Sequence, residues 1–264
     1  MQIYKIIMID KIRFSKKDLT EIEVKRIVET NRLETYNLNG FKHWNNDKTK
    51  NFNGGFSIRI DQNKVLKIEG SLHKYATYLK TKKLDNYSSF SMTEAKNTFN
   101  ILINNLAVDP NNTYIKFYEI GLNLITKNDP KEFLKNIYSI GDLNNEKIFY
   151  VDPKYKKESQ KTTETHRDYR LYFKTYDKIH EMLDNKKEVP NYNIIRIETV
   201  YKRVEKTLIT DFFAKENLKK LQNIFFEKWD KLNFLIEIKA PKGTNYNRIL
   251  YAKKIIRSGK EYRN

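Results

Sequence analysis

Two acidic side chains stand inside runs of apolar residues, where a carboxylate is unusual. Glu119 falls within TYIKFYEIGLNLI and Glu198 within NYNIIRIETVYKR. Both runs alternate with the period of two that is typical of a strand, so each carboxylate is expected beside apolar neighbours. A buried carboxylate is costly unless a metal ion, a cationic partner or a proton compensates it. Both are therefore candidate metal ligands, and an ion pair of Glu119 with Arg196 is the alternative.

A third strand pattern, at residues 168–178, has one apolar face and one basic, aromatic face. Its sequence DYRLYFKTYDK places Leu171, Phe173 and Thr175 on one side. The other side carries Arg170, Tyr172, Lys174, Tyr176 and Lys178. Cations contact phosphates and aromatic rings stack on bases, so this face is typical of a nucleic-acid-binding surface. The alternative is a plain sheet in which an Arg–Glu ion pair accounts for the buried acid.

Two short blocks in these strands, KTYDK and IIRIET, carry a family resemblance. In order and spacing they resemble the YDK-then-R-hydrophobic-E signature of rolling-circle replication initiators, which include the filamentous-phage gene II type and plasmid Rep proteins. A block from Glu69 to Asn86 resembles the family more loosely, as does the strand around Glu119. The resemblance implies an endonuclease dependent on Mg²⁺ or Mn²⁺. Such an enzyme nicks one DNA strand, forms a 5′-phosphotyrosyl link and leaves a 3′-OH for a polymerase.

The resemblance also implies roles for individual residues. Glu119 and Glu198, from strands expected to be neighbours, would supply two metal ligands, and Glu181 would be a weaker third. Carboxylate oxygens are the ligands that hard cations such as Mg²⁺ prefer. Lys178 would be the phosphate cation or the general acid. The paired histidines of many initiators are absent, since the four His stand apart at positions 43, 73, 166 and 180, so carboxylates would dominate the site.

The nucleophile of the family precedes the YDK strand, near a turn that contains glycine. This chain has no Gly between Asp142 and Arg170, so the alignment shifts there. Tyr155 is the first candidate for the nucleophile and Tyr150 the second. Further candidates by position are Tyr169, Tyr172 and Tyr176.

The charge balance favours a polyanionic partner. The chain has 51 Lys and Arg against 33 Asp and Glu, a formal net charge of +18, and AT-rich coding bias is the alternative explanation. Single-stranded or origin DNA is the expected partner, and the resemblance adds a host helicase and polymerase. The residues expected to contact nucleic acid are Lys74, Tyr75, Lys80, Lys82, Arg170, Tyr172, Lys174 and Arg196.

Composition excludes several classes of protein. Without Cys, neither disulfides nor thiolate metal sites can form. No apolar run approaches the roughly 20 residues that span a bilayer, and the first residues lack the basic head of a signal peptide. We therefore expect a soluble, intracellular protein with no membrane partner, and the family resemblance implies the cytoplasm of a host bacterial cell.

The periodicity predicts the elements that must position these residues. Expected strands cover 3–14, 56–60, 64–69, 113–125, 147–151, 168–178 and 191–203. Expected helices cover 18–30, 91–106, 129–140 and 207–226, with the last continuing beyond Trp229. Residues 31–53 are expected to be loop or irregular strand, and 152–167 a basic loop. The predicted fold is α/β (α+β), with a central, mostly antiparallel sheet covered on one face by helices, as the resemblance to Rep endonucleases also implies.

Residues 1–240 are expected to form a single catalytic domain, and two similar halves, about 1–110 and 111–240, are the alternative. Residues 241–264 form a basic C-terminal segment. Besides the nicking enzyme, the sequence allows a non-catalytic nucleic-acid-binding protein or a viral genome-packaging protein. Metal-dependent cleavage of single-stranded DNA that leaves protein on the 5′ end distinguishes the first function from the other two.

Overall fold

A computed structural model describes residues 7–142, 145–151, 159–162, 171–235, 243 and 245. Its strands are β1 (Ile7–Lys16), β2 (Glu34–Leu38), β3 (Phe41–Asn45), β4 (Ser57–Ile60), β5 (Leu66–Ser71), β6 (Thr113–Thr126), β7 (Ile137–Ile140), β8 (Lys147–Val151), β9 (Ser159–Thr162), β10 (Leu171–Asp177), β11 (Asn193–Leu208) and β12 (Leu232–Phe234). Its helices are α1 (Glu21–Asn31), α2 (Leu72–Thr81), α3 (Met92–Asn105), α4 (Pro130–Asn136), α5 (Lys178–Asp184), α6 (Ile209–Phe212) and α7 (Lys215–Trp229).

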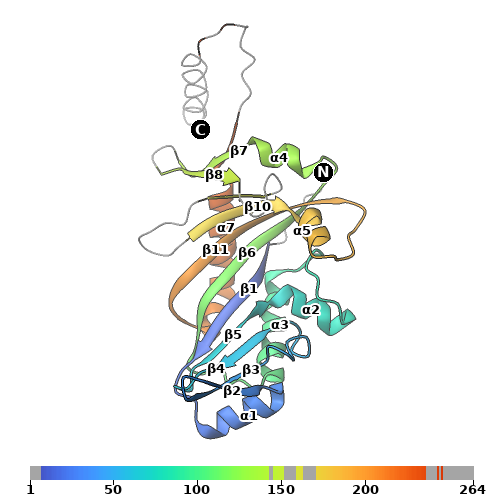
Figure 1. Ribbon diagram of the computed structural model, residues 1–264. Coiled ribbons are helices and arrows are strands. Elements are labelled where there is room, and N and C mark those ends of the chain that lie inside the picture. Colours follow the sequence, from blue (N-terminus) through green and yellow to red (C-terminus); the bar gives the residue numbers. More distant parts are fainter. Residues whose placement is uncertain are drawn as a thin grey trace.

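The described strands form one twelve-stranded sheet in the order β12-β7-β8-β9-β10-β11-β6-β1-β5-β4-β3-β2 (Figure 1). The paired strands run antiparallel, which confirms the predicted α+β fold with a mostly antiparallel sheet. Strands from both expected halves of the chain belong to this sheet, because β6 pairs with both β1 and β11. The central strands therefore bring together residues from the two ends of the sequence.

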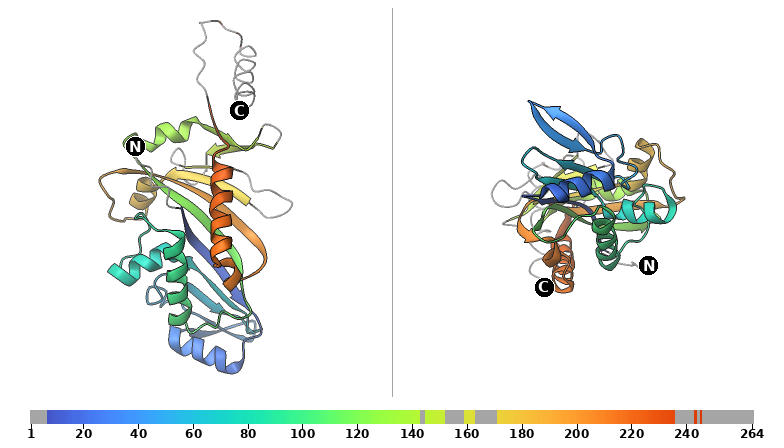
Figure 2. Two further views of the ribbon diagram at one scale, coloured as in Figure 1. Left: turned by 180° about the vertical axis from the view of Figure 1, so that it is seen from behind. Right: turned by 90° about the horizontal axis from the view of Figure 1, so that it is seen from below.

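Helices α3 and α7 lie on the same face of the sheet (Figure 2). Phe99 of α3 packs edge-on against Phe14 of β1, with ring centroids 5.6 Å apart, and stacks on Phe213 at 4.4 Å. Trp229 at the end of α7 donates a hydrogen bond from Nε1 to Oγ1 of Thr199 in β11, at 3.0 Å. Thr199 therefore faces the helices, and its neighbour Glu198 must face the opposite side of the sheet.

Local sequence signals explain where the first helices begin. Thr20 and Glu23 form a capping box at the start of α1, in which each side chain bonds to the backbone of the other residue. Ser91 and Glu94 do the same for α3, in agreement with the helix predicted at 91–106. No helix in the described ranges is long and apolar enough to cross a membrane.

The structure corrects several predicted elements. Residues expected to be loop or irregular strand at 31–53 include the β2–β3 hairpin, whose turn residues Asn39 and Gly40 both have positive φ. The predicted helix at 129–140 ends at Asn136, and the chain continues as β7. After Trp229, the described residues 230–235 contain β12 and no helix, and the segment 152–167 contains β9. The basic segment 241–264 lies outside the described residues, apart from positions 243 and 245.

Candidate metal-binding and nucleic-acid site

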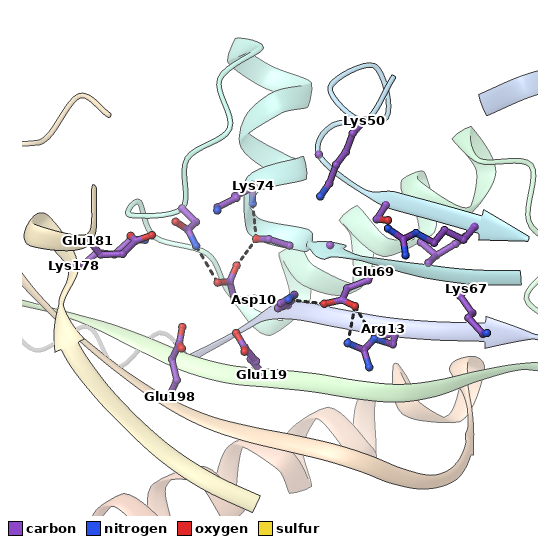
Figure 3. A pocket seen from close by; sticks show the side chains of 18 of the residues that line it. Asp10, Arg13, Lys50, Lys67, Glu69, Lys74, Glu119, Lys178, Glu181 and Glu198 are labelled. Carbon is purple, nitrogen blue, oxygen red and sulfur yellow. Dashed lines mark hydrogen bonds and ion pairs between the residues drawn. The ribbon is translucent and has the colours of Figure 1, made fainter. Parts of the chain in front are cut away.

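Three carboxylates meet on the face of the sheet opposite α7. Asp10 of β1, Glu119 of β6 and Glu198 of β11 each offer an oxygen, and these oxygens lie within 4.8 Å of one another (Figure 3). All three residues are buried. Their strands are neighbours in the order β11-β6-β1, so the sheet itself brings the acids together. We refer to these three residues as the carboxylate site.

Sequence reasoning missed Asp10. It lies where the pairing of β1 with β6 shifts register, between Ile9 and Ile12. Such irregularities redirect side chains and are frequent at functional sites. Asp10 interrupts an apolar strand just as Glu119 and Glu198 do, so the criterion used for those two residues would have identified it.

Arg196 fixes two members of the carboxylate site. It is fully buried and donates from Nε to Oε1 of Glu198 and from Nη2 to Oδ2 of Asp10, both at 2.6 Å. Nη1 donates to the backbone oxygen of Asn86 at 3.0 Å. Burial alone would raise the pKa of Asp10, but Arg196 and further neighbouring groups hold it well below its ordinary value. Arg196 therefore pairs with Asp10 and Glu198, and the pairing with Glu119 considered from the sequence is wrong.

Glu119 is less well compensated. Its carboxylate receives a hydrogen bond from Nζ of Lys174 at 3.3 Å. Burial raises the pKa of Glu119 above its ordinary value, despite the opposing charge of Lys174. Nζ of Lys174 also lies 2.5 Å from Oε2 of Glu198, but this buried oxygen accepts no hydrogen bond of regular geometry. Glu119 and Glu198 thus share one ammonium group.

The chemistry of the carboxylate site fits a hard divalent cation. Mg²⁺ and Mn²⁺ prefer oxygen ligands, and Mg²⁺ is usually bound by a few carboxylates together with water. Asp10, Glu119 and Glu198 each offer an oxygen to such an ion. Gly121 leaves room for the side chain of Glu198, because a Cβ at position 121 would lie 3.0 Å from Cγ of Glu198 and 3.1 Å from the backbone oxygen of Ile197.

A hollow of about 680 Å³ opens over the carboxylate site. Asp10, Glu119 and Glu198 lie at its base, and residues of β1, β4, β5, α2 and α5 contribute to its walls (Figure 3). The cations that line it are Lys11, Arg13, Lys50, Arg59, Lys67, Lys74 and Lys178. Acids at the base and cations around them match a phosphate backbone held against a metal site.

The third predicted metal ligand lies elsewhere. Glu181 of α5 is not a member of the carboxylate site, and it pairs with Lys178 at 2.5 Å (Figure 3). Asp10, and not Glu181, lies within 4.8 Å of the other two acids, while Glu181 lines the same hollow, so its role as a weaker third ligand stays a prediction. Lys178 is buried and lines the hollow, and burial lowers its pKa.

The candidate nucleophiles have different positions. Tyr155 and Tyr169 lie outside the described residues. Tyr150 of β8 is exposed, and its register partners run through Lys161 and Lys174 to Glu198, so these four residues share one face of the sheet. Three strand spacings separate β8 from β11, about 14 Å.

Two further tyrosines occupy β10. The hydroxyl of Tyr176 donates to Oε1 of Glu198 at 3.3 Å, and burial raises the pKa of Tyr176 well above its ordinary value. Tyr172 is half-buried, with Nζ of Lys202 lying 5.0 Å from the centre of its ring. Of these two, Tyr176 is in contact with the carboxylate site.

The predicted nucleic-acid contacts separate into groups. Lys74 lines the hollow, while Lys80 is exposed on α2 and Lys82 is exposed directly after that helix. Tyr75 is buried with its hydroxyl bonded to Asn105, and Arg196 is fully buried, so neither residue can contact nucleic acid and both predictions are wrong. Arg170 lies outside the described residues.

Sequence reasoning also missed cations of the hollow. Arg59 and Lys67 are register partners in the β4–β5 hairpin, and both are exposed on its polar face. The alternation of this hairpin contains that signal, because Arg59 and Lys67 stand between apolar residues on strands that pair directly.

Comparisons with known proteins find similarity among solved structures. No protein-family model matches the chain, and no curated protein matches it. Among solved structures, the chain is similar to a rolling circle replication initiator protein from Geobacillus stearothermophilus. The TM-score is 0.44 and the identity 9%, over 90% of this chain and 89% of the other. The neighbour is the kind of protein that the KTYDK and IIRIET blocks resemble, but a similarity at this TM-score carries no conclusion about activity.

Proposed function

We propose that this protein is a metal-dependent endonuclease that nicks one DNA strand at an origin and starts rolling-circle replication of a phage or plasmid. The observation that carries the proposal is the meeting of Asp10, Glu119 and Glu198 at the base of a hollow lined with cations. Three buried carboxylates held close together on neighbouring strands cost free energy of folding. A metal-dependent reaction on a phosphate backbone explains both the acids and the surrounding positive charge.

The carboxylate site would hold Mg²⁺ or Mn²⁺ through Asp10, Glu119 and Glu198, and the bound ion would polarise the phosphoryl oxygens of the scissile bond. Arg196 keeps two of these carboxylates ionised and oriented, because it is buried between them. The guanidinium therefore positions the ligands and does not touch DNA.

Cations in the walls of the hollow would bind the DNA strand. Lys50, Arg59, Lys67 and Lys74 line the hollow and would contact phosphates on either side of the scissile bond. Such contacts release counterions, so affinity should fall steeply as salt rises. Lys178 would stabilise the phosphate or supply a proton to the departing 3′ oxygen, since burial lowers its pKa and makes proton transfer easier.

In the proposed reaction a tyrosine hydroxyl loses its proton to solvent as its oxygen bonds to phosphorus, the bond from phosphorus to the 3′ oxygen breaks, and that oxygen takes up a proton and leaves as a 3′-OH. Tyr155 and Tyr150 are the proposed nucleophiles. Exposure of Tyr150 on the same sheet face as Glu198 supports its candidacy. Tyr176 is better suited to positioning Glu198, because burial beside this carboxylate disfavours its phenolate.

The proposal is tested by covalent trapping. A panel of single-stranded oligonucleotides is incubated with the protein and Mn²⁺, and adducts that survive denaturing electrophoresis are mapped by mass spectrometry. Changing the nucleophile to Phe should abolish the adduct, and variants at Tyr150, Tyr155 and Tyr176 identify which residue it is. Glu119→Gln and Glu198→Gln should also abolish it while salt-sensitive binding persists. Unchanged adduct yield in both glutamine variants would remove the proposed metal site.

A second function has one observation in its favour. Arg196 and Lys174 already supply cations to the carboxylate site, as expected for a purely structural ion network. The protein would then bind or package nucleic acid without cleaving it. Salt-sensitive DNA binding, with no adduct on any oligonucleotide and no Mn²⁺ binding, would favour this function.

A further inference from the structure

Lys174 lies within the carboxylate site and not on the outer nucleic-acid surface. Its Nζ is 2.5 Å from Oε2 of Glu198 and 3.3 Å from Oε1 of Glu119. Lys174 pairs in register with Glu198 across β10 and β11, which directs both side chains to the same face. The ammonium group therefore contacts two of the acids that would bind the metal.

The charges of the site depend on where this ammonium lies. With Lys174 and Arg196 in place, the three carboxylates retain one net negative charge. A divalent ion added to that arrangement would leave one net positive charge, and like charges at such short range repel strongly in a buried site. A phosphodiester carries one negative charge, so the carboxylates, both cations, the metal and one phosphate together are neutral. The full set is balanced only when metal and DNA are both present.

Lys174 is also the cation of the site that has room to move. Its side chain is 24% exposed, whereas that of Glu198 is 1% exposed and that of Arg196 is fully buried. Arg196 is bonded to Asp10, Glu198 and Asn86 and cannot leave without breaking all these contacts. The long, flexible stem of a lysine can carry its charge from a carboxylate to a nearby phosphate.

We propose that Lys174 is a resident counter-ion that couples metal binding to DNA binding. In the free protein it neutralises Glu119 and Glu198 and weakens the binding of a divalent cation. When DNA enters the hollow, Lys174 turns toward a phosphate and the carboxylates become available to the metal. This inference rests on the proposed function. It adds that the enzyme loads its metal efficiently only with DNA, and that metal strengthens DNA binding to the same degree.

The test measures Mn²⁺ binding, not cleavage. Electron paramagnetic resonance of free Mn²⁺ gives the affinity of the wild type, Lys174→Gln, Lys174→Arg and the control Lys25→Gln. Lys25 also pairs with a glutamate, Glu29, at 4.0 Å, but it lies on α1 and does not line the hollow. Without DNA, Lys174→Gln should bind Mn²⁺ about tenfold more tightly than the wild type, within the usual range of coupling between sites. Lys174→Arg and Lys25→Gln should resemble the wild type.

The second measurement adds the dinucleotide d(TpT), whose single phosphate is small enough to enter the hollow. It should raise the Mn²⁺ affinity of the wild type and leave that of Lys174→Gln nearly unchanged. If Lys174→Gln does not fold by circular dichroism, the effect of d(TpT) on the wild type and on Lys174→Arg decides the matter, since both should show the increase.

The outcomes separate the two proposals. If the wild type binds Mn²⁺ through Glu198 but Lys174→Gln binds no more tightly, the coupling role of Lys174 is overturned and the proposed function stands. An equal effect of d(TpT) on both proteins has the same meaning. If neither protein binds Mn²⁺ with or without d(TpT), the metal site itself is refuted, and the role of Lys174 with it.

Discussion

Replacing Asp10 with asparagine removes one charge from the carboxylate site and almost no volume. Oδ2 of Asp10 accepts hydrogen bonds from Nη2 of Arg196 at 2.6 Å and from Nδ2 of Asn86 at 2.9 Å. The amide oxygen of an asparagine can keep both, and its amide nitrogen can face the hydroxyl of Ser71, which bonds to Oδ1 of Asp10. The variant therefore loses the charge of the carboxylate more than its hydrogen bonds.

The expected cost follows from that distinction. Removing one partner of a buried ion pair typically costs about 3–5 kcal/mol, but Arg196 keeps Glu198, so we expect about 2–3 kcal/mol for Asp10→Asn. The free energy of unfolding of a domain is commonly about 5–15 kcal/mol, so the variant should remain folded. Its metal affinity and its covalent adduct with DNA should both be lost, because a neutral amide is a poorer ligand for Mg²⁺ than a carboxylate.

Urea unfolding and Mn²⁺ binding measure the two effects separately. Asp109→Asn is the matched control, since it removes a carboxylate that pairs with Lys16 at 3.0 Å outside the hollow. It should cost about 1 kcal/mol or less and leave Mn²⁺ binding unchanged. Full Mn²⁺ affinity and adduct yield in a destabilised Asp10→Asn protein would show that Asp10 is purely structural and refute the three-carboxylate site.

The same variant has a definite dependence on pH. The pKa of Asp10 lies below its ordinary value of 3.8 in the folded protein, so the unfolded chain takes up a proton first as the pH falls. The stability that the ionised aspartate contributes is complete above about pH 4 and is lost below it. The difference between wild type and Asp10→Asn should therefore be constant near neutral pH and shrink in acid.

Three further predictions test other parts of the structure. Gly121→Ala should lower the free energy of unfolding by about 1–3 kcal/mol and reduce the yield of adduct, because its Cβ would lie 3.0 Å from Cγ of Glu198. The control Gly40→Ala, where nothing lies within 4 Å of the added Cβ, should lose a little stability in urea unfolding and should keep its adduct yield. Burial lowers the pKa of His73 to about 4 from an ordinary 6.5. Lowering the pH from about 7 to 5 should therefore reduce the free energy of unfolding by about 2 kcal/mol, because the unfolded chain takes up the proton first. An equal reduction in His73→Gln would contradict this prediction. Lys67→Gln should make the negative slope of log affinity against log salt for single-stranded DNA less steep by about 0.7, measured by fluorescence anisotropy. An unchanged slope would exclude a phosphate contact of Lys67.

The strands that carry the site could be predicted from the sequence because they are long and alternate regularly. β6 and β11 were located within a few residues, apart from the C-terminal extension of β11 to Leu208, and Glu119 and Glu198 stood out as acids among apolar neighbours. The helix predicted at 91–106 agrees with α3, whose N-cap is Ser91. Weak periodicity hid the short strands β2, β3 and β9, which lie in polar segments and depend on pairing with their neighbours.

The partners inside the site could not be predicted in the same way. Alternation placed Lys174 and Arg196 on polar or mixed faces, but strand order decides what each cation meets. β10 lies beside β11, so Lys174 reaches the acids, and β1 lies beside β6, so Asp10 comes within reach of Arg196. These contacts join residues far apart in the chain, and local patterns contain no information about them.

The bond between Asp10 and Arg196 spans 186 positions of the chain. A nascent polypeptide that has emerged only through β6 holds Asp10 and Glu119 but lacks both Arg196, which orients Asp10, and the third carboxylate, Glu198. The complete carboxylate site would thus form only after β11 has been synthesised and has paired with β6. Removing β1 or β11 would therefore take away members of the carboxylate site and a strand that pairs with β6 in the middle of the sheet in a single event.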